Sequence, residues 1–127
     1  MSLRSPLGKV LGLGSAKAGA HHWWSQRITA IGLVFLCAWF VISLACLGTF
    51  EYEAVRGWIA GPVNATLLSL LVAVLCYHSQ LGVQVVIEDY VQGALKTASI
   101  LISNFVHVVA GVLGVVSVLR IAFGVAA

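Results

Sequence analysis

The residues of this chain best suited to chemistry are a histidine and an acidic-aromatic pair that belong to one apolar segment. His78 lies within the uncharged stretch 57–87, and Asp89 and Tyr90 follow directly after Glu88. His78 precedes Glu88 by ten residues, which is a depth of about 15 Å at the helical rise of about 1.5 Å per residue. Ionisable groups at that depth in a bilayer are rare and are usually functional or paired. His78 is therefore the first candidate for a functional side chain.

A buried neutral imidazole is suited to binding haem iron as an axial ligand. One histidine supplies only half of a bis-histidine site, so the second ligand is either His107, near the middle of the last apolar segment, or a histidine of another subunit. The alternative is that His78 only forms hydrogen bonds between helices. The residue types leave both interpretations open.

A second group of polar residues precedes the first apolar segment. Arg27 stands at its start, with His21 and His22 six and five residues earlier. A haem bound at the depth of His78 and turned edge-on would extend its propionates toward this face, where arginine and histidine neutralise carboxylates. Alternatively, Arg27 reaches the phosphates of membrane lipids.

The elements that must position these residues follow from composition. Hydrophobic residues make up 61% of the chain and charged residues only 9%, and the mean hydropathy is +1.04. These values indicate an integral membrane protein. Residues 28–50, 57–87 and 97–119 contain no Asp, Glu, Lys or Arg, and each stretch is long enough to cross the bilayer as a helix. We expect an all-α membrane protein with an N-terminal arm at 1–26 and one domain at 27–124, with helices at about 27–50, 62–88 and 96–122.

The basic residues predict how the helices are oriented. Four of the seven precede the first span, and only Arg56 lies in the first loop, so the positive-inside rule places the N-terminus in the cytoplasm. The loop 88–96, with Asp89 and Tyr90, then lies on the same side. The net charge of +3 is explained by this topology, and we expect membrane lipid rather than nucleic acid as a partner. The chain lacks phosphate-loop, nucleophile-elbow and metalloprotease motifs, so no catalytic residue is assigned.

These features together resemble a known family. The stretch His-His-Trp-Trp-Ser-Gln-Arg-Ile-Thr-Ala-Ile at 21–31, then His78, Gly82 and Asp89-Tyr90, is similar to the small hydrophobic membrane anchor subunit of succinate dehydrogenase, the SdhD family of cytochrome b556-type anchors. The likeness covers the N-terminal arm through Tyr90, and the third helix matches only in being apolar.

The resemblance implies that the chain is one half of a six-helix bundle, which it forms with a second anchor, the cytochrome b556 subunit. The two anchors would share one haem b. His78 matches the axial ligand of the haem iron, with the other ligand on the partner, and His107 then becomes a packing or hydrogen-bonding residue. Arg27 and His21 match positions near the haem propionates.

The same resemblance assigns Tyr90 and Asp89 to a quinone site. Tyr90 matches a tyrosine whose hydroxyl hydrogen-bonds a quinone carbonyl, and Asp89 precedes it as in the family motif. An iron–sulfur subunit and an FAD-carrying flavoprotein subunit would dock on this face and pass electrons from succinate to ubiquinone. The location implied is the bacterial cytoplasmic membrane or the mitochondrial inner membrane, with the N-terminus on the cytoplasmic or matrix side.

Two other classes of protein fit the same residues. One is the anchor of a quinol:fumarate reductase, which has the same architecture and the opposite direction of electron flow. The other is a non-redox membrane scaffold or transporter subunit, in which His78, Asp89 and Arg27 only pair helices.

Overall fold

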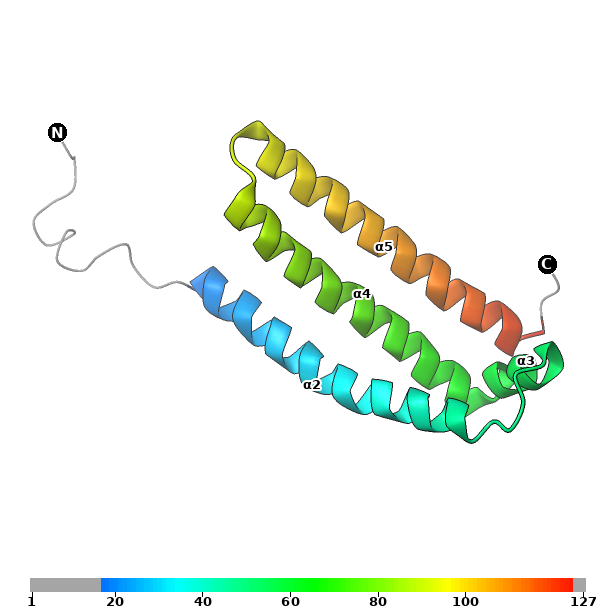
Figure 1. Ribbon diagram of the computed structural model, residues 1–127. Helices are drawn as coiled ribbons and strands as arrows, with labels where there is room; N and C mark the ends of the chain where they lie inside the picture. The colour runs from blue at the N-terminus through cyan, green and yellow to red at the C-terminus, as the bar shows by residue number, and fades with distance from the viewer. Residues whose placement is uncertain (1–16, 125–127) are drawn as a thin grey trace, which may run out of the picture.

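The computed structural model describes residues 17–124, which form three long helices and one short helix (Figure 1). These are α2 (Lys17–Ala45), α3 (Tyr52–Ala60), α4 (Pro62–Tyr90) and α5 (Ala94–Ala122). Residues 17–124 contain no strand, so the predicted all-α class is confirmed. The expected N-terminal arm falls mostly on residues 1–16, which lie outside the described part.

The three long helices have the length and composition of membrane spans. Each contains 29 residues and is therefore about 43 Å long, whereas the hydrocarbon core of a bilayer is about 30 Å thick. Windows within Gly19–Ala45, Pro62–Tyr90 and Ala94–Ala122 are apolar enough to cross it. The prediction of three transmembrane helices is confirmed.

The first helix begins earlier than the expected residue 27. α2 starts at Lys17, because Gly19 is the only residue of 17–27 that strongly disfavours a helix. As a result, the polar residues from His21 to Arg27 occupy defined faces of a helix instead of an extended arm.

A short helix interrupts the predicted loop 51–62. Within α3, Trp58 stacks on Trp39 of α2, with the ring centroids 6.0 Å apart. The Nδ2 of Asn64 donates a hydrogen bond to the carbonyl oxygen of Trp58 at 2.8 Å. Pro62 begins α4, where a proline costs no helical hydrogen bond. Through these contacts the segment 51–62 packs against the end of α2 and the start of α4.

The long helices lie side by side, with α4 between α2 and α5 (Figure 1). The closest approach is between α4 and α5: a Cβ added at Gly114 would lie only 2.7 Å from Cγ1 of Val72, and one at Gly111 would lie 3.6 Å from Cβ of Cys76. In the chain as described, α2 and α5 do not contact each other. α4 is therefore the central element and carries side chains toward both neighbours.

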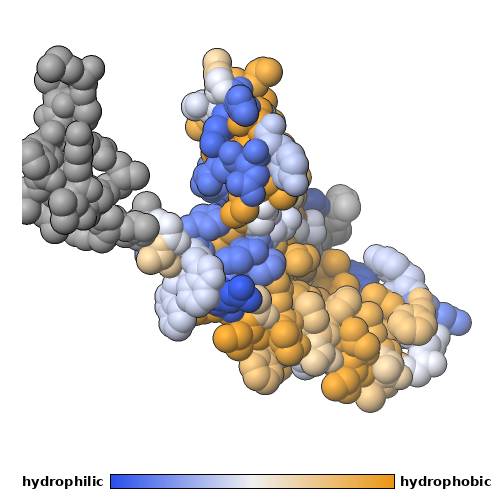
Figure 2. All heavy atoms as spheres, turned by 60° about the vertical axis from the view of Figure 1, so that its left-hand side comes forward, coloured by the Kyte–Doolittle hydropathy of each residue, from blue (hydrophilic) through white to orange (hydrophobic). Residues whose placement is uncertain are grey.

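Few side chains are buried by this arrangement. The buried hydrophobic residues of the described part are one on α2 and four on α4, namely Leu36, Ala65, Leu68, Leu71 and Leu81. Large apolar side chains such as Phe35 and Phe105 remain about 70% exposed. On the face in Figure 2, hydrophilic residues gather toward the end where α2 begins and α4 ends, and much of the rest is hydrophobic. Such a surface is suited to lipid and to further membrane helices.

Candidate functional site

A cavity lies between α2 and α4 near the end where α2 begins and α4 ends. Its volume is about 650 Å³, within the range of small-molecule and cofactor sites. The α2 residues that line it recur every three or four positions and therefore lie on one face of that helix. The lining residues are Gly19, His22, Trp23, Gln26, Arg27 and Ala30 from α2, and His78, Gln84, Val85 and Glu88 from α4.

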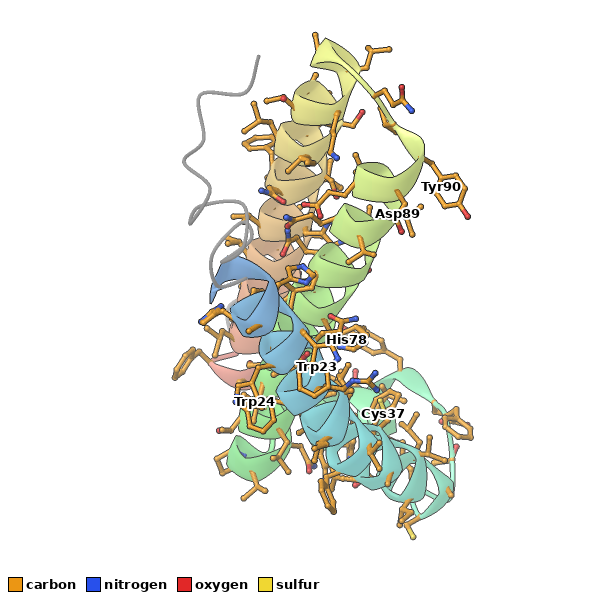
Figure 3. The ribbon with its side chains drawn as sticks, turned by 90° about the vertical axis from the view of Figure 1, so that its left-hand side faces the viewer. Trp23, Trp24, Cys37, His78, Asp89 and Tyr90 are labelled. Carbon is orange, nitrogen blue, oxygen red and sulfur yellow. The ribbon has the colours of Figure 1, made fainter. Side chains whose placement is uncertain are left out.

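His78 is the histidine that α4 directs toward α2. The Nδ1 of its ring lies 2.9 Å from Oγ1 of Thr29, and its Nε2 lies 3.5 Å from Nε2 of Gln26. Figure 3 shows His78 on the part of α4 that lies beside α2, well away from the end of α4. The imidazole is half-buried and lines the cavity.

Two polar atoms of the cavity wall are buried without a hydrogen-bond partner. They are Nε2 of His22 and Oε1 of Gln26. A buried polar atom without a partner costs free energy, so this wall favours a bound group with polar atoms of its own. Gly82 faces the same wall, and a Cβ there would lie 3.6 Å from Nε2 of Gln26.

The charged groups of the cavity come from both helices. The Arg27 guanidinium lies over the ring of Trp23, 5.5 Å from its centroid, and is exposed. On α4, Nε2 of Gln84 donates a hydrogen bond to Oε1 of Glu88 at 2.8 Å. Arg27 therefore offers a positive charge at the edge of the cavity, where a ligand carboxylate could pair with it.

Three residues predicted for the site lie outside this cavity. His21 is exposed, and its neighbour His22 lines the cavity in its place. Asp89 and Tyr90 occupy the end of α4, and Tyr90 is 84% exposed and points away from the helices (Figure 3). The structure thus brings His78 and Arg27 together at one cavity and places Asp89 and Tyr90 on the neighbouring surface.

His107 belongs to a separate groove of about 590 Å³ between α4 and α5. Its Nδ1 donates a hydrogen bond to the carbonyl oxygen of Ser103 at 2.7 Å, and its Nε2 lies 3.2 Å from Oγ of Ser79. Both ring nitrogens therefore have partners within the chain. His78 and His107 line different hollows on opposite sides of α4.

Sequence reasoning noted His22 only as a neighbour of Arg27, and it missed Gln26 of the α2 wall together with Thr29. These three residues are spaced four and three residues apart, so a helical reading of 17–30 would have placed them on one face. Within residues 17–124 no group of three or more His, Cys, Asp or Glu side chains is arranged to hold a metal ion. His78 on its own could supply one axial ligand to the iron of a macrocyclic cofactor.

The fold and this cavity define an integral membrane subunit with three spanning helices and a polar site toward one end. A sequence profile of the family described as succinate dehydrogenase/fumarate reductase transmembrane subunit matches residues 1–119. The chain therefore belongs to that family, and the resemblance drawn from its motifs is confirmed.

Curated relatives are similar over most of the chain. The succinate dehydrogenase hydrophobic membrane anchor subunit of Rickettsia bellii is 41% identical over 90 residues, which are 69% of this chain and 70% of the relative. The subunit of the same name from Paracoccus denitrificans is 31% identical over 99 residues, 78% of this chain and 77% of that one. Together with the fold, these similarities support assigning the chain as a membrane anchor subunit of a succinate dehydrogenase complex.

Proposed function

We propose that this chain anchors a succinate:ubiquinone oxidoreductase, respiratory complex II, and contributes to its haem b and ubiquinone sites. The observation that carries the proposal is that His78 and Arg27 line the same cavity between α2 and α4. A ring nitrogen for iron and a cation for a carboxylate are the two features that a haem carrying propionates requires.

The residues of the cavity fit such a group. His78 would provide one axial nitrogen, and Arg27 with His22 would pair with the propionates. The unpartnered Nε2 of His22 and Oε1 of Gln26 supply further polar contacts. The apolar part of the macrocycle would contact Ala30 and Val85. When bound, haem b supplies a one-electron carrier.

The second axial ligand would come from another subunit. His107 has partners for both of its nitrogens in the groove between α4 and α5, so it does not compete for this role. The exposed apolar surface of α2 and α5 would be covered by lipid and by a second three-helix anchor, the cytochrome b556 subunit. The resulting six-helix bundle would enclose the haem between the two anchors.

Tyr90 and Asp89 would contribute to the ubiquinone site. Both are exposed at the end of α4, and the phenol of Tyr90 points away from this chain, so it can hydrogen-bond a quinone carbonyl at a boundary with other subunits. The iron–sulfur subunit and the FAD-carrying flavoprotein subunit would dock at this end. Because Arg27 and Lys96 also lie toward this end, it would face the cytoplasm or the mitochondrial matrix.

The test begins with the complex that copurifies with this chain from native membranes in mild detergent. We expect succinate-driven ubiquinone reduction and a haem b spectrum. His78→Ala should deplete haem relative to flavin, whereas His107→Ala, which alters the histidine of the groove between α4 and α5, should keep it. Haem content unchanged by His78→Ala would remove His78 as a ligand. A complex that instead reduces fumarate with a low-potential quinol would be the fumarate reductase alternative.

A further inference from the structure

The side chain of Thr29 connects α2 to the imidazole of His78. Its Oγ1 lies 2.8 Å from the carbonyl oxygen of Ser25 and 3.1 Å from that of Gln26. The same oxygen lies 2.9 Å from Nδ1 of His78. The hydroxyl group of Thr29 therefore has three possible hydrogen-bond partners: two carbonyl oxygens, which can only accept, and one ring nitrogen, which can donate or accept.

The single hydroxyl proton determines how these contacts are arranged. Threonine in a helix often donates its proton to a carbonyl of the preceding turn, and here two carbonyl oxygens lie within reach. If the proton pointed elsewhere, a lone pair of Oγ1 would face a lone pair of the Ser25 carbonyl oxygen at 2.8 Å. With the proton of Thr29 donated to the backbone, Oγ1 can only accept from His78, which must carry its proton on Nδ1.

This assignment leaves the Nε2 of His78 with a lone pair. The Nε2 of Gln26 lies 3.5 Å from it, and this amide nitrogen can only donate. Gln26 and His78 both line the cavity between α2 and α4. Histidines that bind metals nearly always donate their other ring N–H to a fixed acceptor, which orients the ring and makes it more basic.

We propose that Thr29 is a positioning residue that holds His78 with its proton on Nδ1, so that Nε2 is the atom presented to haem iron. The inference rests on the proposed haem function and adds a residue that acts through His78. Because the hydrogen bond increases electron donation from the ring, removing it should weaken haem binding and favour the reduced iron.

The experiment compares Thr29→Val, which removes the acceptor, with Thr29→Ser, which retains it. The matched control is Thr66→Val: the hydroxyl of Thr66 donates to the carbonyl oxygen of Pro62 at 2.8 Å, toward the opposite end of the molecule and away from His78. In purified complexes the readouts are haem b per flavin, haem transfer to apomyoglobin, the haem midpoint potential and the low-spin electron paramagnetic resonance signal.

We expect Thr29→Val to lower haem affinity about 10- to 100-fold, as loss of such a partner typically does, and to shift the midpoint potential to more positive values. Thr29→Ser and Thr66→Val should match the wild type. Where Thr29→Val does not assemble, Thr29→Ala removes the hydroxyl without adding a branched side chain.

Wild-type haem affinity, potential and resonance signal in an assembled Thr29→Val or Thr29→Ala complex would overturn the inference. A Thr29→Ser complex as defective as Thr29→Val would also overturn it, because packing rather than the hydroxyl would then matter. The haem proposal itself fails in a different way: His78→Ala would retain haem, or the wild-type complex would contain none.

Discussion

Replacing Gly114 with alanine tests the packing of α5 against α4. The added Cβ would lie 2.7 Å from Cγ1 of Val72, about 1 Å inside the optimal carbon–carbon separation of about 3.5–4.0 Å. Valine in a helix has essentially one side-chain rotamer, so Val72 cannot turn aside and the helices must separate. Overpacking of this kind costs about 1–3 kcal/mol, of which about 1 kcal/mol is offset because alanine is favoured over glycine within a helix. We therefore expect Gly114→Ala to destabilise the subunit by up to about 2 kcal/mol.

Two further variants make the test specific. Gly111→Ala is the matched control on the same helix, because its Cβ would lie 3.6 Å from Cβ of Cys76, an ordinary contact. Alanine is also favoured over glycine within a helix by about 1 kcal/mol, so Gly111→Ala should be neutral or stabilising. Val72→Ala removes the obstructing Cγ1 and should relieve most of the cost of Gly114→Ala.

The assay is thermal denaturation of the purified complex in mild detergent, followed as the fraction that elutes intact after heating. The Gly114→Ala complex should lose integrity at a lower temperature than the wild type, and the Gly111→Ala complex should not. The reasoning is refuted if Gly114→Ala is as heat-stable as the wild type, or if it causes the same loss in a Val72→Ala background.

Two predictions concern the proposed redox sites. Tyr90→Phe should slow ubiquinone reduction about 2- to 10-fold, as expected for one lost hydrogen bond, while succinate oxidation by a soluble dye persists; equal losses in both assays would instead indicate misassembly. Arg27→Gln removes a cation beside the cavity and should shift the haem midpoint potential to more negative values, because a nearby positive charge favours reduced iron. Arg56→Gln, at an exposed position of α3, is the control. A potential that is unchanged or raised in Arg27→Gln would contradict the proposed pairing with propionates.

The sequence predicted the spanning helices because composition alone determines whether a segment is stable in lipid. It also singled out His78 and Arg27, which line one cavity, since a histidine at mid-membrane depth and an arginine at the start of a span stand out from apolar neighbours. The start of α2 was harder to predict. The glycines at 12, 14 and 19 favour a flexible arm, and this signal conceals the helix that begins at Lys17.

That difference explains the site residues that were missed. Because α2 includes residues 17–27, His22, Gln26 and Thr29 lie on one face of the helix. His21 is rotated by about 100° from His22 around the helix axis. Which face meets α4 depends on packing between helices, which one sequence does not reveal. The surroundings of Asp89 and Tyr90 depend on other subunits, because this chain leaves both side chains exposed.

The length of the helices has a consequence for the electrostatics of the cavity. Helices of 29 residues exceed the hydrocarbon thickness by about 13 Å, so their terminal turns extend into the headgroup layer. His22 lies in the second turn of α2 and Glu88 in the last turn of α4, whereas His78 lies about three turns deeper than Glu88. The cavity therefore spans a dielectric boundary. An amphiphile bound there would keep its ionised groups hydrated and screened near Arg27, while electrostatic interactions around His78 would be stronger because water is scarce.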